Sequence, residues 1–252
     1  IKFDVLREHY DATVLATGLT GDRPLGIEGD RLSGVYGAGT LTRVLNTHPG
    51  EQAALPELGD HVILVGGGNV AIDLLRFLVK SHEQYDQSDI ADHALEGYLS
   101  SPAKSVTLLN RSSAADAKSD PQMLKELANI ARAHYSSPEF SLDTGDADTM
   151  DRTAAARVAA FGELFSEGRT PAPGPDVSFR FGSTPIRVLG TDRVEGIEVL
   201  TQDGVEILPA TSVITAIGFE SEDNLLHPEL HAHSAVGRIE PGLYRTGWAK
   251  RG

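Results

Sequence analysis

The stretch of sequence that most constrains the fold is residues 62–73, which read V-I-L-V-G-G-G-N-V-A-I-D. A short apolar run leads into three consecutive glycines, and an amphipathic segment follows them. This order predicts a buried strand that turns tightly into a helix beginning near Asn69 and ending near Lys80. Gly66 and Gly68 permit the sharp turn and let the main chain approach a pyrophosphate, whose charge the helix N-terminus complements. The segment is therefore a candidate phosphate-binding loop for a dinucleotide.

Composition narrows the classes of function. A chain of 252 residues is long enough for one large domain or two modest ones. Its 22 basic and 36 acidic residues give a formal net charge of −14, which disfavours nucleic acid or an anionic membrane surface as a partner. The absence of cysteine from the sequence excludes disulfides, thiolate metal sites and cysteine-based redox steps within it. Because we see neither a membrane-spanning run nor a signal peptide, we expect a cytoplasmic protein.

The next predicted strand, Ser105–Leu109, ends at a position that selects between cofactors in dinucleotide-binding folds. An acidic residue at this position accepts hydrogen bonds from the 2′-hydroxyl of NAD, whereas an arginine pairs with the 2′-phosphate of NADP. Arg111 follows the strand after one intervening asparagine and therefore favours NADP. Without the upstream glycines, an ordinary surface arginine at a strand end would be the better interpretation.

Helical spacing of apolar residues predicts three further helices, over residues 89–101, 121–135 and 152–166. Thr149 or Asp151 would cap the third of them. The polar segment that precedes this third helix is predicted to be a solvated loop.

Two groups of possible metal ligands occur in the sequence: Asp143, Asp146, Asp148 and Asp151, and His227, His231 and His233. The aspartates lack the glycine and the terminal glutamate of a calcium-binding loop. The histidines lie in a stretch with no helical or strand pattern that would hold ligands in place. We therefore predict polar loops in both places and no metal site.

From Val177 to Gly218 the apolar residues alternate with a period of two. The alternating runs are 177–181, 186–189, 194–200 and 205–208. An Asp-Gly pair separates the last two runs and is a strong hairpin signal, so the region is predicted to be an antiparallel meander. A strand over Val213–Ile217 then returns the chain to the parallel sheet.

Two strand-like segments, Tyr10–Gly18 and Thr211–Phe219, end alike in small residues and glycine. Such a pair is typical of two chain crossings at one junction. Two ordinary buried parallel strands would give the same composition, and composition alone favours that simpler interpretation.

The chain ends with G-L-Y-R-T-G-W-A-K-R-G at residues 242–252. This motif, the three glycines at 66–68 (the glycine loop) and the Tyr10–Gly18 strand together resemble the adrenodoxin-reductase-type ferredoxin–NADP reductases. These are flavoproteins with two dinucleotide-binding domains. Residues 88–95 also resemble an insertion that these enzymes carry. The resemblance spans essentially the whole chain, and both termini look cut.

The resemblance implies an α/β fold of glutathione-reductase type. It would consist of a Rossmann-like NAD(P)-binding domain with a parallel sheet and an antiparallel β-meander crossover, plus short remnants of the FAD domain. Residues 21–217 would form the NADP-binding domain, and residues 1–20 and 218–252 would belong to the FAD domain. The FAD site would lie mostly outside this chain.

The resemblance also carries over cofactor-binding residues: Gly66, Gly67, Gly68, Asn69, Val70, Arg111, Ser112, Glu126, Trp248 and Gly252. Those of the glycine loop would bind the NADP pyrophosphate, Arg111 the 2′-phosphate, Glu126 the adenosine side or ribose, and Trp248 the flavin. The family commonly has two adjacent arginines at the phosphate site, whereas Arg111 is followed by two serines in a slightly longer loop. Lys118 could compensate for the missing arginine.

The implied reaction is hydride transfer between NADPH and FAD, with electrons exchanged with a ferredoxin-type iron–sulfur protein. Spacing nominates no catalytic residue, and the chain by itself should be inactive. Two alternatives stay open: a flavoprotein of the glutamate-synthase small-subunit type, which the W-x-K-R-G ending disfavours, and a non-catalytic nucleotide-binding module.

Overall fold

The computed structural model describes most of the chain, namely residues 2–51, 54–86, 88–130, 132–141, 150–166, 173–220 and 237–251. The chain divides into two compact units. The larger unit is continuous and covers Pro24–Ile217, whereas the smaller unit combines Ile1–Arg23 with Gly218–Gly252.

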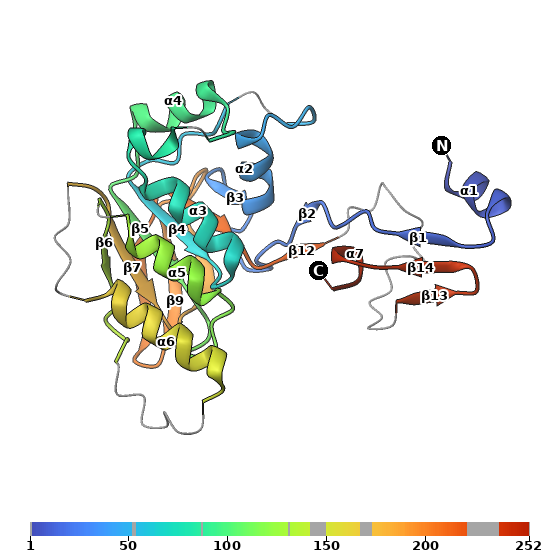
Figure 1. Cartoon of the computed structure of the whole chain (residues 1–252). Coiled ribbons are helices and arrows are strands. Elements are labelled where there is room, and N and C mark those ends of the chain that lie inside the picture. Colours follow the sequence, from blue (N-terminus) through green and yellow to red (C-terminus); the bar gives the residue numbers. More distant parts are fainter. Residues whose placement is uncertain are drawn as a thin grey trace. The chain divides into compact units, whose positions relative to one another are not determined.

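The larger unit is built on a six-stranded parallel sheet (Figure 1). Its strands, in spatial order, are β3 (Val35–Gly37), β11 (Ser212–Thr215), β4 (His61–Val65), β5 (Ser105–Leu109), β7 (Asp176–Arg180) and β6 (His134–Ser136). The α-helices of this unit are α2 (Ala38–Leu45), α3 (Asn69–Val79), α4 (Asp92–Ser100), α5 (Pro121–Ala128) and α6 (Arg152–Leu164), and a short 3₁₀ turn, η1, covers His82–Tyr85.

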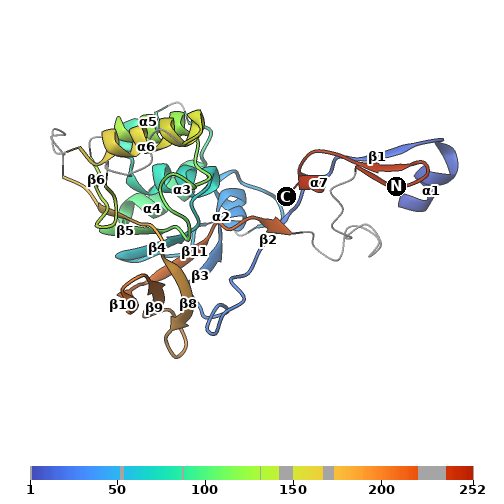
Figure 2. The same cartoon turned by 90° about the horizontal axis from the view of Figure 1, so that it is seen from below.

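The helices cover one face of the sheet and an antiparallel meander covers the other (Figure 2). The meander consists of β8 (Thr184–Leu189), β9 (Gly196–Thr201) and β10 (Gly204–Pro209). Strand β4 shows the layering, because alternate side chains of a strand point to opposite faces. Val62 and Leu64 pack in the cluster with the helices, whereas Ile63 and Val65 pack with the meander. A strand buried on both faces explains why this segment reads as an unbroken apolar run.

The predicted fold class is confirmed, but the first strand assigned to the meander was wrong. Residues 177–180 lie in β7, a parallel strand of the main sheet between β5 and β6, and Phe181 directly follows it. Their alternation has a physical cause. Val177 and Phe179 are buried against the helices, whereas the side chain of Arg180 pairs with Glu206 of the meander. A polar contact on one face therefore imitates the pattern of a half-buried antiparallel strand.

The helix boundaries also differ from expectation in places. The helix predicted over 121–135 ends at Ala128 with Asn129 as its C-cap, and edge strand β6 follows. Elements β3 and α2 were not predicted. Helix α3 ends at Val79 and α6 at Leu164, close to the predicted positions. Among the described residues no helix is both long and apolar enough to span a bilayer.

The smaller unit contains two little sheets. One has the order β1 (Thr13–Leu15), β14 (Leu243–Arg245), β13 (Arg238–Glu240), and the other pairs β2 (Gly21–Asp22) with β12 (Phe219–Glu220). Helices α1 (Phe3–His9) and α7 (Trp248–Arg251) complete its elements in the described ranges. The two crossings of the chain run antiparallel side by side, because β2 pairs with β12 and the Arg23 N–H donates to the Gly218 carbonyl at 3.2 Å.

Candidate functional site

The glycine loop lies at the carboxyl end of β4, where the chain turns directly into α3. Gly66 has φ +138°, a conformation that residues with a Cβ rarely adopt, and its N–H donates to the Leu109 carbonyl at 2.9 Å. A Cβ on Gly66 would lie 2.3 Å from the Ala216 carbonyl oxygen. The turn is thus held between the ends of β5 and β11, and only glycine fits its first position.

The next two glycines differ in their surroundings. A Cβ on Gly67 would lie 2.3 Å from Asn110 Nδ2, so this glycine is packed against a side chain. A Cβ on Gly68 would meet nothing closer than the Lys118 Cβ at 3.9 Å, so this glycine borders open space. Gly68 is the N-cap of α3 and makes no side-chain capping bond. The N–H groups of the first helical turn, including Asn69 and Val70, therefore have no side-chain acceptor at the cap and suit an anion.

Asn110 connects the glycine loop to the segment that follows β5. Its side chain is buried, and its Oδ1 accepts hydrogen bonds from the Ser112 N–H at 3.2 Å and the Ser112 hydroxyl at 3.0 Å. The backbone donor fixes the orientation of the amide, which leaves Nδ2 as a buried donor without a partner among the described residues. Asn110 was not predicted as a site residue, although a polar residue directly after a buried strand was a usable signal.

The segment 111–120 folds back from the end of β5 to the start of α3. The main chain of Lys118 forms an isolated parallel bridge with that of Gly68, and the Asp120 N–H donates to Asn69 Oδ1 at 2.8 Å. Arg111 and Lys118 are exposed, and no ion pair involves either within the described ranges. Seven of the predicted residues therefore gather at one edge of the sheet: Gly66, Gly67, Gly68, Asn69, Val70, Arg111 and Ser112.

Glu126 lies elsewhere on the larger unit. It is on the second turn of α5, and its Oε2 is 3.5 Å from Nη1 of Arg76, the eighth residue of α3. The same guanidinium approaches Asp73 at 3.5 Å, and burial raises the pKa of the Asp73 carboxyl. Arg76 lies eight residues after Gly68, about two helical turns along α3. The assignment of Glu126 to the adenosine side stays a prediction.

Trp248 begins α7 in the smaller unit and is 56% exposed. Its ring centroid is 5.5 Å from that of Phe219 in β12, with an interplanar angle of 54°. The indole thus combines an aromatic support with an open surface, which suits stacking on a planar ring. Gly252 lies outside the described residues.

Metal sites are not found in the described ranges, where no three or more His, Cys, Asp or Glu side chains are arranged to hold an ion. Asp151 is the N-cap of α6, and the Thr153 and Ala154 N–H groups that bond it lower the pKa of its carboxyl. The other six possible metal ligands considered from the sequence lie outside the described residues: Asp143, Asp146, Asp148, His227, His231 and His233.

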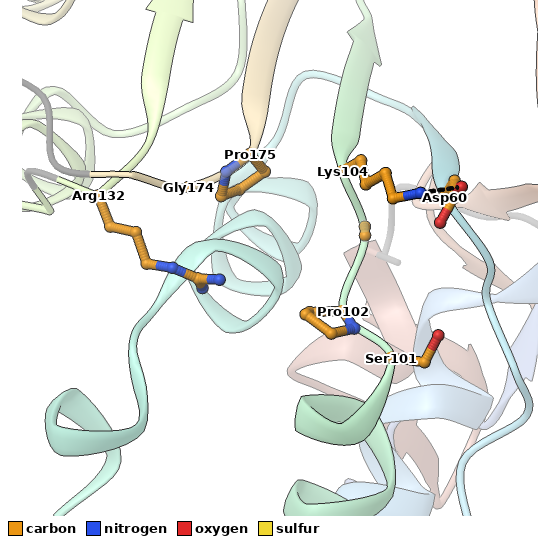
Figure 3. A pocket seen from close by; sticks show the side chains of 8 residues that line it. Asp60, Ser101, Pro102, Lys104, Arg132, Gly174 and Pro175 are labelled. Atoms are coloured by element: carbon orange, nitrogen blue, oxygen red, sulfur yellow. Dashed lines mark hydrogen bonds and ion pairs between the residues drawn. The ribbon is translucent and has the colours of Figure 1, made fainter.

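A cavity of about 430 Å³ opens at the opposite, amino-terminal edge of the sheet (Figure 3). Asp60, Lys104 and Pro175 line it and directly precede β4, β5 and β7. The basic side chains that line the cavity already interact with other groups. Lys104 Nζ is 2.7 Å from Asp60 Oδ2, and Arg132 donates to the Lys80 carbonyl at 2.8 Å. The cavity is therefore separate from the glycine loop, and its basic groups already have partners.

No protein-family model matches the chain, whereas curated proteins and solved structures are similar to it. The chain is 34% identical to cindoxin reductase of Citrobacter braakii, covering 100% of this chain and 55% of the relative. It is 30% identical to the mitochondrial NADPH:adrenodoxin oxidoreductase of Arabidopsis thaliana, covering 100% and 61%. It is 31% identical to the NADPH-ferredoxin reductase FprA of Mycobacterium tuberculosis, covering 98% and 59%.

Among solved structures, FprA of Mycobacterium tuberculosis in complex with NADPH matches with a TM-score of 0.87 and 26% identity. That match covers 100% of this chain and 60% of the solved one. The chain thus spans a little over half the length of the relatives that it matches. Over that length, its homologues are adrenodoxin-reductase-type ferredoxin–NADP reductases.

Proposed function

We propose that this chain is the NADP(H)-binding portion of an FAD-dependent ferredoxin–NADP reductase. Residues 21–217 would form the NADP-binding domain, and residues 1–20 and 218–252 would contribute to the FAD domain. One observation carries the proposal. A glycine loop that can accept no side chain at Gly66 meets, at the same sheet edge, an exposed arginine after β5. This is where a parallel α/β sheet binds the phosphates of a dinucleotide.

The residues present fit the pyrophosphate of NADP. Side chains are excluded at Gly66 and Gly67, and the space beside Gly68 stays open. The start of α3, which no side chain caps, adds N–H donors and the positive end of the helix dipole. Asn69 and Val70 would donate from that first turn. These groups bind and orient, and they hold no proton that the reaction needs.

Arg111 and Ser112 would contact the adenosine 2′-phosphate. The Ser112 hydroxyl is held by Asn110 Oδ1 at 3.0 Å, which fixes the start of the segment. Glu126 remains a proposed adenosine-side contact, and Trp248 and Gly252 remain proposed flavin contacts. When bound, NADPH would supply a hydride to FAD, and the flavin would pass the two electrons singly to an iron–sulfur acceptor and release the proton. The chain's own task is alignment, so no acid–base group is assigned.

The proposed partner is a ferredoxin-type iron–sulfur protein. NADPH:adrenodoxin and NADPH-ferredoxin reductases occur among the relatives, which supports this class of acceptor. A net charge of −14 gives no basic docking face on average, so we expect the docking contacts to be local or to lie in the rest of the reductase. We propose a cytoplasmic location, which cell fractionation would check.

The test is a titration of the full-length protein with NADPH. We expect loss of the visible absorbance of a bound flavin and, with ferredoxin added, reduction of that acceptor. A full-length protein that binds nucleotide but carries no flavin would favour the non-catalytic module instead. Flavin reduction without any transfer to ferredoxin would favour the glutamate-synthase type.

A further inference from the structure

The phosphate-selecting end of the site is short of positive charge. A phosphate monoester carries a charge of about −1.5 to −2 near neutral pH, more than one arginine balances. Arg111 directly follows the turn after β5, whereas the next two residues are serines. A second cation would have to come from elsewhere in the fold.

Lys118 is brought to this place by the return of the segment 111–120. Its main chain bridges that of Gly68, the N-cap of α3. Its neighbours Ala117 and Ser119 are buried while Lys118 is exposed. In an extended bridge, successive side chains point in opposite directions, so the lysine side chain leaves the segment away from the core and beside the loop.

The segment is held firmly, so this position is built into the fold. Arg157 of α6 donates from Nε to the Ser119 carbonyl at 2.8 Å and from Nη1 to the Ala115 carbonyl. The Asp120 N–H is bonded to the side chain of Asn69 at 2.8 Å. The segment is therefore held to α6 on both sides of Lys118, at Ala115 and Ser119, and to α3 at Asp120.

We propose that Lys118 is the second cation of the 2′-phosphate site and that Arg157 is the positioning residue that holds it there. The inference rests on the proposed function, because it concerns the same dinucleotide. It names a residue that specifies NADP over NAD without contacting the nicotinamide. Arg111 opens the segment 111–120 and Lys118 lies near its end, beside the N-cap of α3, and under this proposal the 2′-phosphate binds both a guanidinium and an ammonium.

The pyrophosphate has its own donors in the α3 N-terminus, so the lysine adds most where those donors do not reach. This distinction is measurable. The compound 2′,5′-ADP carries the 2′-phosphate without a pyrophosphate, whereas 5′-ADP carries the pyrophosphate without the 2′-phosphate. A lysine that serves the 2′-phosphate affects only the first of these ligands.

The experiment measures the dissociation constants of NADP⁺, NAD⁺, 2′,5′-ADP and 5′-ADP for the full-length protein and for Lys118→Ala, by calorimetry at fixed ionic strength. We expect about tenfold weaker binding of NADP⁺ and 2′,5′-ADP, with NAD⁺ and 5′-ADP changed less than about twofold. Lys118→Arg should restore most of the affinity. Lys104→Ala, which removes the same charge at the opposite sheet edge, should leave all four constants within about twofold.

Equal weakening of all four ligands would overturn the 2′-phosphate assignment, and no weakening would show a solvated surface lysine. Either result leaves the proposed function intact if the unsubstituted protein still prefers NADP⁺. Absence of nucleotide binding to the unsubstituted protein would instead defeat the proposed function, which separates the two failures.

Arg157 is tested through its selectivity effect. Arg157→Ala should lower the preference for NADP⁺ over NAD⁺ by severalfold, because the lysine is released from its position. Adding Lys118→Ala to it should cost little more, since both substitutions then remove the same interaction. A purely structural role would lower the melting temperature and leave the selectivity ratio unchanged, and that pattern would reject the positioning role.

Discussion

The two edges of the parallel sheet in the larger unit carry similar side chains and use them differently. At the carboxyl edge, Arg111 and Lys118 are exposed beside the glycine loop and form no ion pair in the described part of the chain. At the amino edge, Lys104 is paired with Asp60 and Arg132 is bonded to main-chain carbonyls. Basic residues near strand ends are thus not informative by themselves. What distinguishes a binding edge is that its cations and N–H groups remain available.

The largest expected effect is at Gly66. Gly66→Ala would force a Cβ to 2.3 Å from the Ala216 carbonyl oxygen at φ +138°, and no side-chain movement can relieve a clash with main chain. We expect the free energy of unfolding to fall by about 3 kcal/mol and NADP⁺ binding to be lost. Denaturant unfolding and calorimetry would measure both. Gly182→Ala is a matched control, with φ +62° and nothing within 4 Å of its Cβ position. Comparable losses in the two variants would show that the clash is not the cause.

Gly67 differs from Gly66, because a Cβ there would clash with a side chain rather than with main chain. A Cβ there would lie 2.3 Å from Asn110 Nδ2, so Gly67→Ala should cost about 1–2 kcal/mol of stability. Asn110→Ala removes that atom, and the double variant should recover most of the loss. A double-mutant cycle from unfolding curves measures the coupling. Strictly additive effects would mean that the two residues do not constrain each other.

At the opposite edge, Arg132 serves stability rather than binding. Its guanidinium donates to the Lys80 carbonyl at 2.8 Å, at the C-terminus of α3. Arg132→Ala should lower the free energy of unfolding by about 1 kcal/mol and leave the affinity for NADP⁺ unchanged, because the contact lies at the far end of the helix. A clear loss of nucleotide affinity at full stability would break the contrast between the edges.

The smallest effect is expected at Lys104. Its ion pair with Asp60 is solvent-exposed, with 73% and 44% of the two side chains accessible, so Lys104→Ala should change stability by less than about 1 kcal/mol. Raising the salt concentration should shrink even this difference, since exposed pairs are screened. Thermal unfolding at low and high salt would show it. A large, salt-insensitive loss would indicate that the cavity depends on this pair.

Local signals in the sequence identify the strand, glycine loop and helix around residues 61–79, because burial on both faces and tight turn geometry leave direct marks on residue type. Strand β5 was likewise predictable at Ser105–Leu109 from its apolar run. Strand β3 and helix α2 were not predicted, because α2 has only eight residues and begins after a glycine, which has no capping side chain. Strand β7 was assigned to the wrong sheet because a partner on its second face supplies polar contacts.

Local sequence patterns could not predict contacts between residues that are far apart in the chain. Lys118 was a hypothesis from charge alone, and its bridge to Gly68, fifty positions earlier, depends on how the segment 111–120 folds back. Arg157 gave no signal at all, because its acceptors Ala115 and Ser119 are main-chain carbonyls about forty residues away. Every residue has a main-chain carbonyl, so a hydrogen bond to one leaves no trace in the identity of the accepting residue. Site residues of this kind emerge only from the folded chain.

The antiparallel pairing of β2 with β12 has a consequence for modularity. The chain enters the larger unit after Arg23 and leaves it before Gly218, and these two residues share a hydrogen bond of 3.2 Å. A unit whose entry and exit coincide can be gained or lost in a single insertion event without separating the flanking segments. It can equally be excised as one continuous piece for separate production, or re-cut at a surface loop with its native ends joined by a short linker.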